Sequence, residues 1–388
     1  MRPIRIVTIA PTPYLDGPGA VIKGILMHLD RLHFEPSFIS IINRPESARY
    51  PHMIETLKKL NIPFNCMNMV KPLDLLSPFR IASFLRRQRP DIVHTHMIRG
   101  NIYGRVAALL AGVRQVVSTV HSSKQWMESH PLIESSADLL DKLTVGIASK
   151  VVTVSEELQE KLVKLHGYRY CDLMTIPNGI DLGLFEKGEA DRAEARRWIG
   201  ADENSFIVGF VGRIDKEKNP LLMMEVMKRV FQKQPEVLLA VAGEGRMRDQ
   251  VADRVRSLGI VDKVRLMGHI KDIPLLLSGF DAFFMCSLYE GHPIALCEAM
   301  ASGLPCVTTP VGGTRRMMKH EKNGFVVGFN DIMGMEETLL ALIRNRSLAA
   351  SVGQAARATI REEFTEERMS QAYQSLYKSL MEADSAVV

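Results

Sequence analysis

The sequence predicts an α/β protein made of two Rossmann-like parallel-sheet domains that face a central cleft. Its 388 residues exceed the length that one ordinary hydrophobic core accommodates. Short apolar runs alternate with amphipathic stretches along the whole chain, a pattern typical of parallel sheets with helices on both faces. The pattern restarts near residue 200, after the polar stretch Glu186–Asn204. We therefore expect a first domain at residues 1–183 and a second at 184–364.

The first half of the chain contains six apolar runs and four amphipathic stretches. The runs predict strands at Ile4–Ala10, Ser37–Ile42, Ile92–His94, Val116–Val120, Val151–Val154 and Leu173–Ile176, and Asn61–Phe64 could add a short one. The amphipathic stretches predict helices at Ala20–Leu32, Met53–Leu60, Arg80–Gln88 and Tyr103–Ala111.

The second half repeats this pattern and ends in a helix that no strand follows. The predicted strands are Phe206–Val211, Leu238–Ala242, Val264–Met267, Ala282–Met285 and Cys306–Thr308. The predicted helices are Leu221–Lys233, Arg246–Leu258, Leu296–Ala301 and Met335–Arg344. The terminal stretch Thr365–Leu380 is also helical in pattern, and its apolar face needs a partner. We expect residues 365–388 to pack back onto the first domain.

Composition and charge indicate a globular protein of the cytoplasm. The net charge of +5 is a mild excess that favours anionic ligands, and we expect no nucleic-acid partner. The five cysteines form no C-x-x-C pair, which predicts reduced, packed thiols. The first apolar run is too short for a signal peptide, and no run approaches the roughly 20 residues that span a bilayer.

The richest motif is EGHPIALCEAM, which begins at Glu290 just after a predicted strand. Pro293 suits the first turn of a helix, where no amide donor is required. The unpaired amides of Ile294 and Ala295 would then present the positive end of the helix to a pyrophosphate. Glu298, about one and a half turns inside, could accept two hydrogen bonds from a ribose diol. The alternative is that both glutamates are ordinary surface charges.

A second motif follows the first strand of the second domain. Arg213 and Lys218 lie five residues apart in a loop with Asp215 and Glu217. Two cations that converge on a diphosphate would stabilise the charge that grows on it as a glycosidic bond breaks. In other enzymes a divalent metal ion stabilises this charge, and the present chain has no Asp-x-Asp motif to hold such an ion. We expect no metal and no cofactor. The alternative is a solvated charged loop.

In the first domain, glycines and histidines follow the strands. The segment Asp16–Ala20 opens a helix, and Gly19 would let a backbone amide approach the donor phosphate or the acceptor. It lacks the G-x-G-x-x-G dinucleotide fingerprint. His121 ends a strand, where a lone histidine is usually a packing residue. His94 and His96 form an H-x-H, but no further ligands stand at zinc spacing, which favours a role lining the acceptor side.

Taken together, these motifs resemble the retaining glycosyltransferases of the GT-B architecture, in particular the GT4 family (glycosyl transferases group 1). The Glu-x7-Glu spacing is typical of that family. Further segments match its phosphate loop, interdomain segment, base-side loops and first-domain strand ends: Phe210–Pro220, Pro177–Asp181, Val241–Gly245, Leu266–His269, Val93–His96 and Thr119–His121. The resemblance covers most of the chain.

The resemblance implies a metal-independent hexosyltransferase that uses a nucleoside-diphosphate sugar, UDP favoured and GDP second. The acceptor would be a hydroxyl of a glycan, a glycolipid or a small molecule, in polysaccharide or glycoconjugate biosynthesis. The residues implied in catalysis are Arg213, Lys218, Glu290 and His121. Those implied in donor binding are Gly19, Arg213, Lys218, Gly243, His269, Ile270, Glu290, Ile294, Ala295 and Glu298.

We expect retention to arise from a front-face displacement through an ion-pair-like transition state. A covalent route would need a carboxylate nucleophile below the sugar, and Glu290 is a poor one if it holds the sugar hydroxyls. The departing diphosphate would instead accept the proton of the acceptor. Domain closure would exclude water and so prevent hydrolysis.

Three other functions fit the same fold class. A nucleotide-sugar epimerase would use related phosphate contacts without an acceptor. A dehydrogenase is disfavoured by the missing glycine fingerprint, and a non-catalytic scaffold is expected to lose one of Arg213, Lys218 and Glu298. The chain departs from the family at Arg315-Arg316, where a glutamate is common. The basic stretch Leu85–Arg89 could contact anionic lipid at a membrane surface, or be a solvated helix end.

Overall fold

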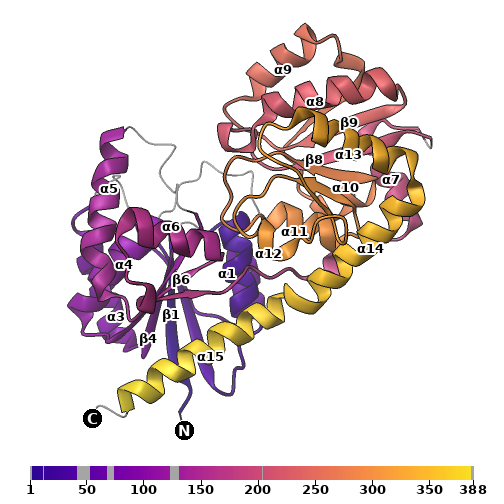
Figure 1. Cartoon of the computed structure of the whole chain (residues 1–388). Helices are drawn as coiled ribbons and strands as arrows, with labels where there is room; N and C mark the ends of the chain where they lie inside the picture. The colour runs from indigo at the N-terminus through magenta and orange to yellow at the C-terminus, as the bar shows by residue number, and fades with distance from the viewer. Residues whose placement is uncertain are drawn as a thin grey trace. The chain divides into compact units, whose positions relative to one another are not determined.

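The computed structural model of the chain describes residues 2–11, 13–41, 53–67, 74–122, 131–202 and 204–385. The chain divides into two compact units (Figure 1). The first contains Met1–Gly179 together with Glu366–Val388, and the second contains Ile180–Thr365. The first boundary therefore lies a few residues before the predicted one. Ile42, the last residue of one predicted strand, lies outside the described residues.

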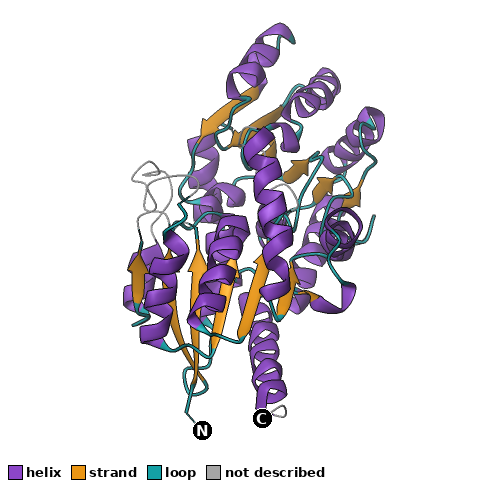
Figure 2. Cartoon of the chain, turned by 90° about the vertical axis from the view of Figure 1, so that its left-hand side faces the viewer, coloured by secondary structure: helices purple, strands orange, loops and turns teal. Residues whose placement is uncertain are grey.

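The first unit is built on a seven-stranded parallel sheet of order β3-β2-β1-β4-β5-β6-β7 (Figure 2). Its strands are β1 (Ile4–Ala10), β2 (Phe34–Ser40), β3 (Phe64–Cys66), β4 (Ile92–His96), β5 (Gln115–Val120), β6 (Lys150–Thr153) and β7 (Leu173–Thr175). Successive strands are added toward one side of the sheet up to β3 and toward the other side from β4 onward. The position between β1 and β4, where this order reverses, is the kind of position where open sheets bind ligands. Strand β2 starts earlier than predicted because Phe34 is fully buried.

Helices surround this sheet. They are α1 (Gly17–Met27), α2 (Met53–Lys59), α3 (Ser77–Gln88), α4 (Met97–Ala111), α5 (Pro131–Thr144), α6 (Glu156–His166) and α15 (Glu366–Ser385). Helix α1 begins at Gly17 and not at Ala20, because the Asp16 carboxylate caps it by accepting a bond from the Gly19 amide. Helices α5 and α6 were not predicted. Ser155 caps α6 by accepting from the amide of Leu158, a signal present in the sequence.

The second unit contains a six-stranded parallel sheet of order β10-β9-β8-β11-β12-β13. Its strands are β8 (Phe206–Val211), β9 (Val237–Ala242), β10 (Val264–Gly268), β11 (Ala282–Met285), β12 (Cys306–Thr308) and β13 (Phe325–Val326). All but the two-residue β13 match predicted runs. Strands β8 to β12 follow the predicted βα alternation, and side chains from β8, β9 and β11 fill one hydrophobic core.

The helices of the second unit are α7 (Glu189–Ile199), α8 (Pro220–Lys233), α9 (Arg248–Ser257), α10 (Ile273–Ser278), α11 (Ile294–Ala301), α12 (Thr314–Met317), α13 (Ile332–Arg344) and α14 (Arg346–Glu363). The polar stretch after residue 186 forms α7, held by bonds from Arg192 and Arg196 to the Asp281 carboxylate at 2.6 and 3.1 Å. Helix α14 was not predicted, and it packs on α11.

The cysteines depart from the prediction in one respect. All five are free thiols, and Cys286, Cys297 and Cys306 are buried in the second unit. Cys171 is exposed instead of packed, because it lies in a short 3-10 turn, Tyr170–Asp172, before β7.

The C-terminal helix α15 belongs to the first unit (Figure 1). Packing and side-chain hydrogen bonds hold it there. It packs along α1, where the Ser370 hydroxyl donates to the carbonyl of Ile25 at 3.1 Å. Two buried tyrosines continue this contact. The Tyr377 hydroxyl lies 2.7 Å from His94 Nδ1, and the Tyr373 hydroxyl lies 3.1 Å from Thr119 Oγ1. The helix thereby closes over polar side chains of β4 and β5.

We predict that Tyr377→Phe lowers the free energy of unfolding by about 1–3 kcal/mol, because it leaves a buried histidine nitrogen without its partner. The measurement is urea unfolding followed by circular dichroism. Tyr170→Phe, which removes a hydroxyl from a side chain that is 68% exposed, is the matched control. Equal stability of the two variants would contradict the prediction.

Candidate functional site

The loops that follow β8, β9, β10, β11 and β12 are joined at the carboxyl edge of the second sheet. The backbone hydrogen bonds that connect them include those from the amides of Gly212, Gly243, Leu288 and Gly313 to the carbonyls of Ala242, Gly268, Glu217 and Gly291, at 3.0, 2.7, 2.7 and 2.9 Å. This is the edge at which parallel sheets bind ligands. The loops that carried the predicted motifs of the second domain therefore form one continuous surface.

Two glycines make this close packing of loops possible. Gly243 has a φ of 140°, and a Cβ placed on it would lie 1.9 Å from the carbonyl oxygen of Gly212. Gly312 has a φ of 51°, and its Cβ would lie 2.3 Å from the carbonyl oxygen of Gly291. Only glycine adopts these conformations at such short separations.

Lys218 and Glu290, which the sequence places 72 residues apart, form an ion pair. The Lys218 Nζ donates to Glu290 Oε1, and both side chains are largely buried. Lys218 ends the short 3-10 turn after β8, and Glu290 lies in the loop after β11, the neighbouring strand in the sheet. The sheet order thus brings together two predicted site residues.

Arg213 lies in the same loop as Lys218 but is 50% exposed. Its guanidinium donates to Glu217 at 2.7 Å and lies 3.4 Å from a carboxylate oxygen of Asp215. Asp215 is itself buried, and it accepts a 2.8 Å hydrogen bond from the amide of Arg246. The two carboxylates hold Arg213 at the rim of the loop, where its charge stays accessible to solvent.

Helix α11 begins at Ile294, two residues before the predicted start at Leu296, and Pro293 is its N-cap and not a residue of its first turn, with φ −73° and ψ 102°. The Pro293 carbonyl accepts from the amides of Leu296 and Cys297 at 3.1 and 3.2 Å. In the part of the chain that the structure describes, no acceptor bonds the amides of Ile294 and Ala295. These two amides form the positive end of the helix dipole.

Glu298 lies one turn after Ile294, on the part of α11 that the core does not fully bury. Burial raises the pKa of Glu298 to about 7. No described side chain bonds its carboxylate, although the flanking Cys297 and Ala299 are fully buried. The group is therefore available to accept hydrogen bonds from a ligand, and its charge changes near neutral pH.

His269 and Ile270 follow β10 at the end of this loop series. His269 is half-buried and Ile270 is buried in the core of the second unit.

Arg315 and Arg316 are exposed on the short helix α12, which starts directly after the Gly312–Gly313 turn. The two departures from the family pattern therefore add positive charge at the surface near the Glu290 loop.

His292 is a residue whose role the sequence analysis missed. It is buried among Phe364, Cys297 and Gly313, and a Cβ on Gly313 would lie 2.4 Å from its ring. Burial, with a smaller effect of the nearby Arg316 charge, lowers the pKa of His292 to about 3. A neutral, packed histidine at this place fixes the turn between β12 and α12 against the Glu290 loop.

The first unit holds a cluster of neutral histidines at the carboxyl ends of β4 and β5. His96 Nδ1 lies 3.2 Å from His121 Nε2, and their rings stack with centroids 5.5 Å apart. His94 Nε2 lies 2.8 Å from Thr119 Oγ1. Burial lowers the pKa of His121 to about 4, and burial with a smaller effect of His121 lowers that of His94 to about 3. The cluster therefore carries no charge near neutral pH.

The orphaned nitrogen of His96 indicates which tautomer His121 adopts. His96 Nε2 is buried and has no hydrogen-bond partner among the described residues. A buried N–H without an acceptor costs more than an unused lone pair, so the proton of His96 lies on Nδ1. It donates to His121 Nε2, and His121 consequently keeps its own proton on Nδ1. This leaves His121 one hydrogen-bond donor for a ligand.

Gly19 occupies the first turn of α1, after β1. Its amide donates to the Asp16 carboxylate at 2.9 Å, so the helix cap engages it in this structure. A Cβ at this position would lie 1.8 Å from the carbonyl oxygen of Tyr14. The close approach of the chain to itself is one physical reason for glycine here.

Across the ranges given above, no three His, Cys, Asp or Glu side chains are grouped so that they could hold a metal ion. None of the described helices combines the length and the hydropathy that crossing a bilayer requires.

Comparison with known proteins adds a family and a fold. The family described as glycosyl transferases group 1 matches residues 191–359, and glycosyltransferase family 4 matches residues 15–184. The chain is 28% identical over 344 residues to the Escherichia coli UDP-Gal:α-D-GlcNAc-diphosphoundecaprenol α-1,3-galactosyltransferase, covering 88% of this chain and 87% of that protein. It is 27% identical to N-acetyl-α-D-glucosaminyl L-malate synthase of Bacillus anthracis, with 81% of each covered.

Solved structures show the same architecture. The crystal structure of HepE from Anabaena in complex with UDP and glucose matches with a TM-score of 0.82 at 19% identity, covering 97% of this chain and 100% of HepE. This likeness extends over both units. The chain therefore belongs to the GT4 family, the glycosyl transferases of group 1, and is a glycosyltransferase with the GT-B fold.

Proposed function

We propose that the protein transfers a hexose, with retention at the anomeric carbon, from a UDP-sugar to a hydroxyl of a glycan or glycolipid. The observation that carries this proposal is the Lys218–Glu290 pair in the joined loops that also carry the open amides of α11. Two similar proteins support UDP as the nucleotide: the E. coli relative is named for UDP-Gal, and HepE from Anabaena was crystallised with UDP. A GDP-sugar is the second choice.

The positive groups of the second unit would bind the leaving diphosphate. Lys218 and Arg213 supply cationic donors, and the amides of Ile294 and Ala295 supply the end of a helix dipole. Their positions are fixed before the reaction, so they stabilise the charge on the diphosphate without reorganising as it develops. We propose on this ground that catalysis needs no metal ion.

Glu290 would hold hydroxyls of the donor sugar and not attack it. Its carboxylate is already bonded to Lys218, and a carboxylate whose charge is neutralised in this way is a weak nucleophile. We propose a front-face displacement in which a diphosphate oxygen accepts the proton of the attacking hydroxyl. In this mechanism the acceptor oxygen bonds to the anomeric carbon on the face from which the diphosphate leaves.

The remaining predicted residues would bind the rest of the donor. Glu298 would accept from the ribose diol, while the loops at Gly243 and at His269–Ile270 would contact the base. In the first unit, neutral His121 would donate from Nδ1 to a sugar hydroxyl, and Gly19 would lie beside the phosphate or the acceptor. A neutral histidine suits this task, because it binds a hydroxyl without adding charge.

We also propose that the protein works in the cytoplasm in peripheral contact with a membrane surface. Phe79 on the outer face of α3 and the N-cap residue Leu76 are each 61% exposed, and they lie beside exposed Arg80, Arg86 and Arg87. Exposed apolar and basic side chains on one helix face suit an anionic bilayer. The E. coli relative acts on an undecaprenol-linked acceptor, which supports a glycolipid substrate here.

We predict that Lys218→Ala lowers kcat by about 10²–10³-fold, because the diphosphate loses a positioned positive charge in the transition state. The measurement is UDP release from a UDP-hexose in the presence of acceptor. Lys216→Ala, which removes an exposed lysine from the same loop, is the matched control.

The Lys218→Ala variant leaves the buried Glu290 carboxylate without its partner. The double variant Lys218→Ala/Glu290→Gln is therefore tested beside it. Thermal unfolding checks that each variant is folded. Full activity in a folded Lys218→Ala chain would contradict the proposal. Incubation of the donor alone, with a search for an isomerised sugar nucleotide, separates transfer from epimerisation.

We predict that UDP affinity falls as pH drops below about 7, because Glu298, whose burial raises its pKa to about 7, accepts ribose hydrogen bonds only when ionised. The fall should approach tenfold per pH unit below that pKa. Calorimetric titrations of the unaltered chain and of Glu298→Gln over the same pH range test this. The variant shows how much of the pH dependence arises from protonation of UDP itself. Parallel pH profiles in the two chains would exclude this role for Glu298.

A further inference from the structure

A hollow lies in the first unit at the amino edge of its sheet, far from the histidine cluster. It is lined by residues just before or at the start of three strands, namely Arg5 of β1, Asp91 before β4 and Arg114 before β5. The end of α3 and the end of α15 complete its wall. Because His96 ends β4, this hollow lies roughly 17 Å away along the strand. It is therefore separate from the predicted reaction site.

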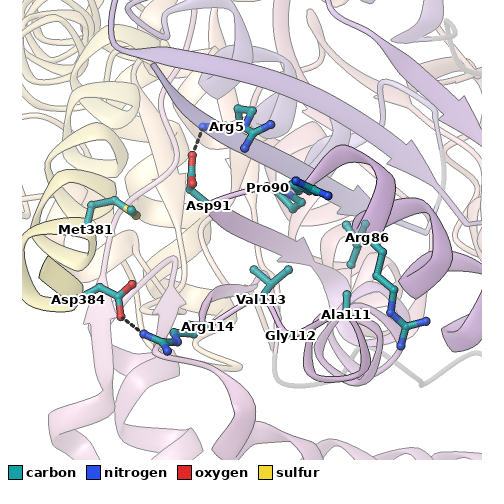
Figure 3. A pocket seen from close by; sticks show the side chains of 12 residues that line it. Arg5, Arg86, Pro90, Asp91, Ala111, Gly112, Val113, Arg114, Met381 and Asp384 are labelled. Atoms are coloured by element: carbon teal, nitrogen blue, oxygen red, sulfur yellow. Dashed lines mark hydrogen bonds and ion pairs between the residues drawn. The ribbon is translucent and has the colours of Figure 1, made fainter. Parts of the chain in front are cut away.

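The hollow is rich in positive charge. Figure 3 shows Arg5 and Asp91 on one side of it, Arg114 and Asp384 on another, and Arg86 on a third. Arg89, which also lines it, caps the end of α3 in a left-handed conformation with a φ of 46°. The lining thus contains four arginines against two aspartates.

The two aspartates form side-chain ion pairs with Arg114 and with Arg2, and not with Arg5, Arg86 or Arg89. The Asp91 carboxylate accepts 2.8 and 2.6 Å bonds from Arg2, outside the lining, and a 2.9 Å bond from the amide of Arg5. Asp384 lies 3.6 Å from Arg114. Within the described ranges, no carboxylate bonds the guanidinium groups of Arg5, Arg86 or Arg89.

One hydrogen-bond donor of the Arg5 side chain lacks an acceptor among the described residues. Its Nε is buried and has no hydrogen-bond acceptor among the described residues, while its Nη1 donates to the carbonyl of Gln88 at 3.3 Å. Buried donors in folded proteins are almost always paired, so this unpaired donor is one reason to expect an acceptor in the hollow. The acceptor that suits several guanidinium groups is an oxyanion with more than one oxygen.

We propose that this hollow binds a phosphate group, as a monoester or a diester, through Arg5, Arg86 and Arg89. Phosphate oxygens match the planar fork of guanidinium donors, and the lining offers three such forks, one from β1 and two from the end of α3. The volume of about 510 Å³ accommodates a phosphate together with its substituent. The phosphate belongs either to a free solute or to the headgroup of an anionic lipid, and the site does not depend on the proposed transfer reaction.

The test compares two double variants that each remove two exposed positive charges. Arg86→Gln/Arg89→Gln alters the hollow, and Arg344→Gln/Arg361→Gln alters exposed arginines on α13 and α14 of the second unit. Both keep the loops of the second unit, so a difference between them reports on the hollow alone. Calorimetric titration with inorganic phosphate should show about tenfold weaker binding in the first variant only.

A vesicle experiment then separates the two sources of phosphate. Co-sedimentation is measured with vesicles of phosphatidylglycerol in phosphatidylcholine, and with phosphatidylcholine alone. Loss of binding to the anionic vesicles in Arg86→Gln/Arg89→Gln assigns the site to a lipid headgroup, and unchanged vesicle binding assigns it to a soluble phosphate. Equal phosphate affinity of both double variants overturns the proposal, even if vesicle binding is lost, because diffuse charge on α3 would explain that loss.

Discussion

The ion pair between Lys218 and Glu290 is the contact on which the arrangement of the candidate site depends. It joins the loop after β8 to the loop after β11, in the middle of the second sheet. With both side chains largely buried, either charge alone would be costly, so each loop holds the other in place. The Leu288–Glu217 backbone bond supports the same junction, and the glycines at 243 and 312 allow the neighbouring loops to close against it.

Much of this organisation could be predicted from the sequence. The strands of the second unit, the loops after them and the residues Arg213, Lys218, Glu290 and Glu298 follow from apolar periodicity and from motifs at strand ends. Helix α14 could not be placed, because its apolar residues face α11 and lack a strand to mark them. The tautomer of His121 depends on His96, which ends the adjacent strand β4 and lies 25 residues earlier in the chain, so local sequence pattern does not reveal it.

The first unit uses the two edges of one sheet for different chemistry. At the carboxyl edge, burial keeps His94, His96 and His121 neutral, and α15 covers them through Tyr373 and Tyr377. At the amino edge, arginines surround a hollow that anions would fill. The neutral edge suits sugar hydroxyls and the cationic edge suits phosphate, so binding at one need not compete with binding at the other.

We propose above all that fixed protein charges and amide dipoles bind the diphosphate of the donor without a metal ion. Calorimetric titration of UDP into the chain, in excess EDTA and then with added magnesium or manganese, tests this claim most directly. We expect the same dissociation constant in all three conditions. Binding that disappears in EDTA and returns with either metal would contradict the account.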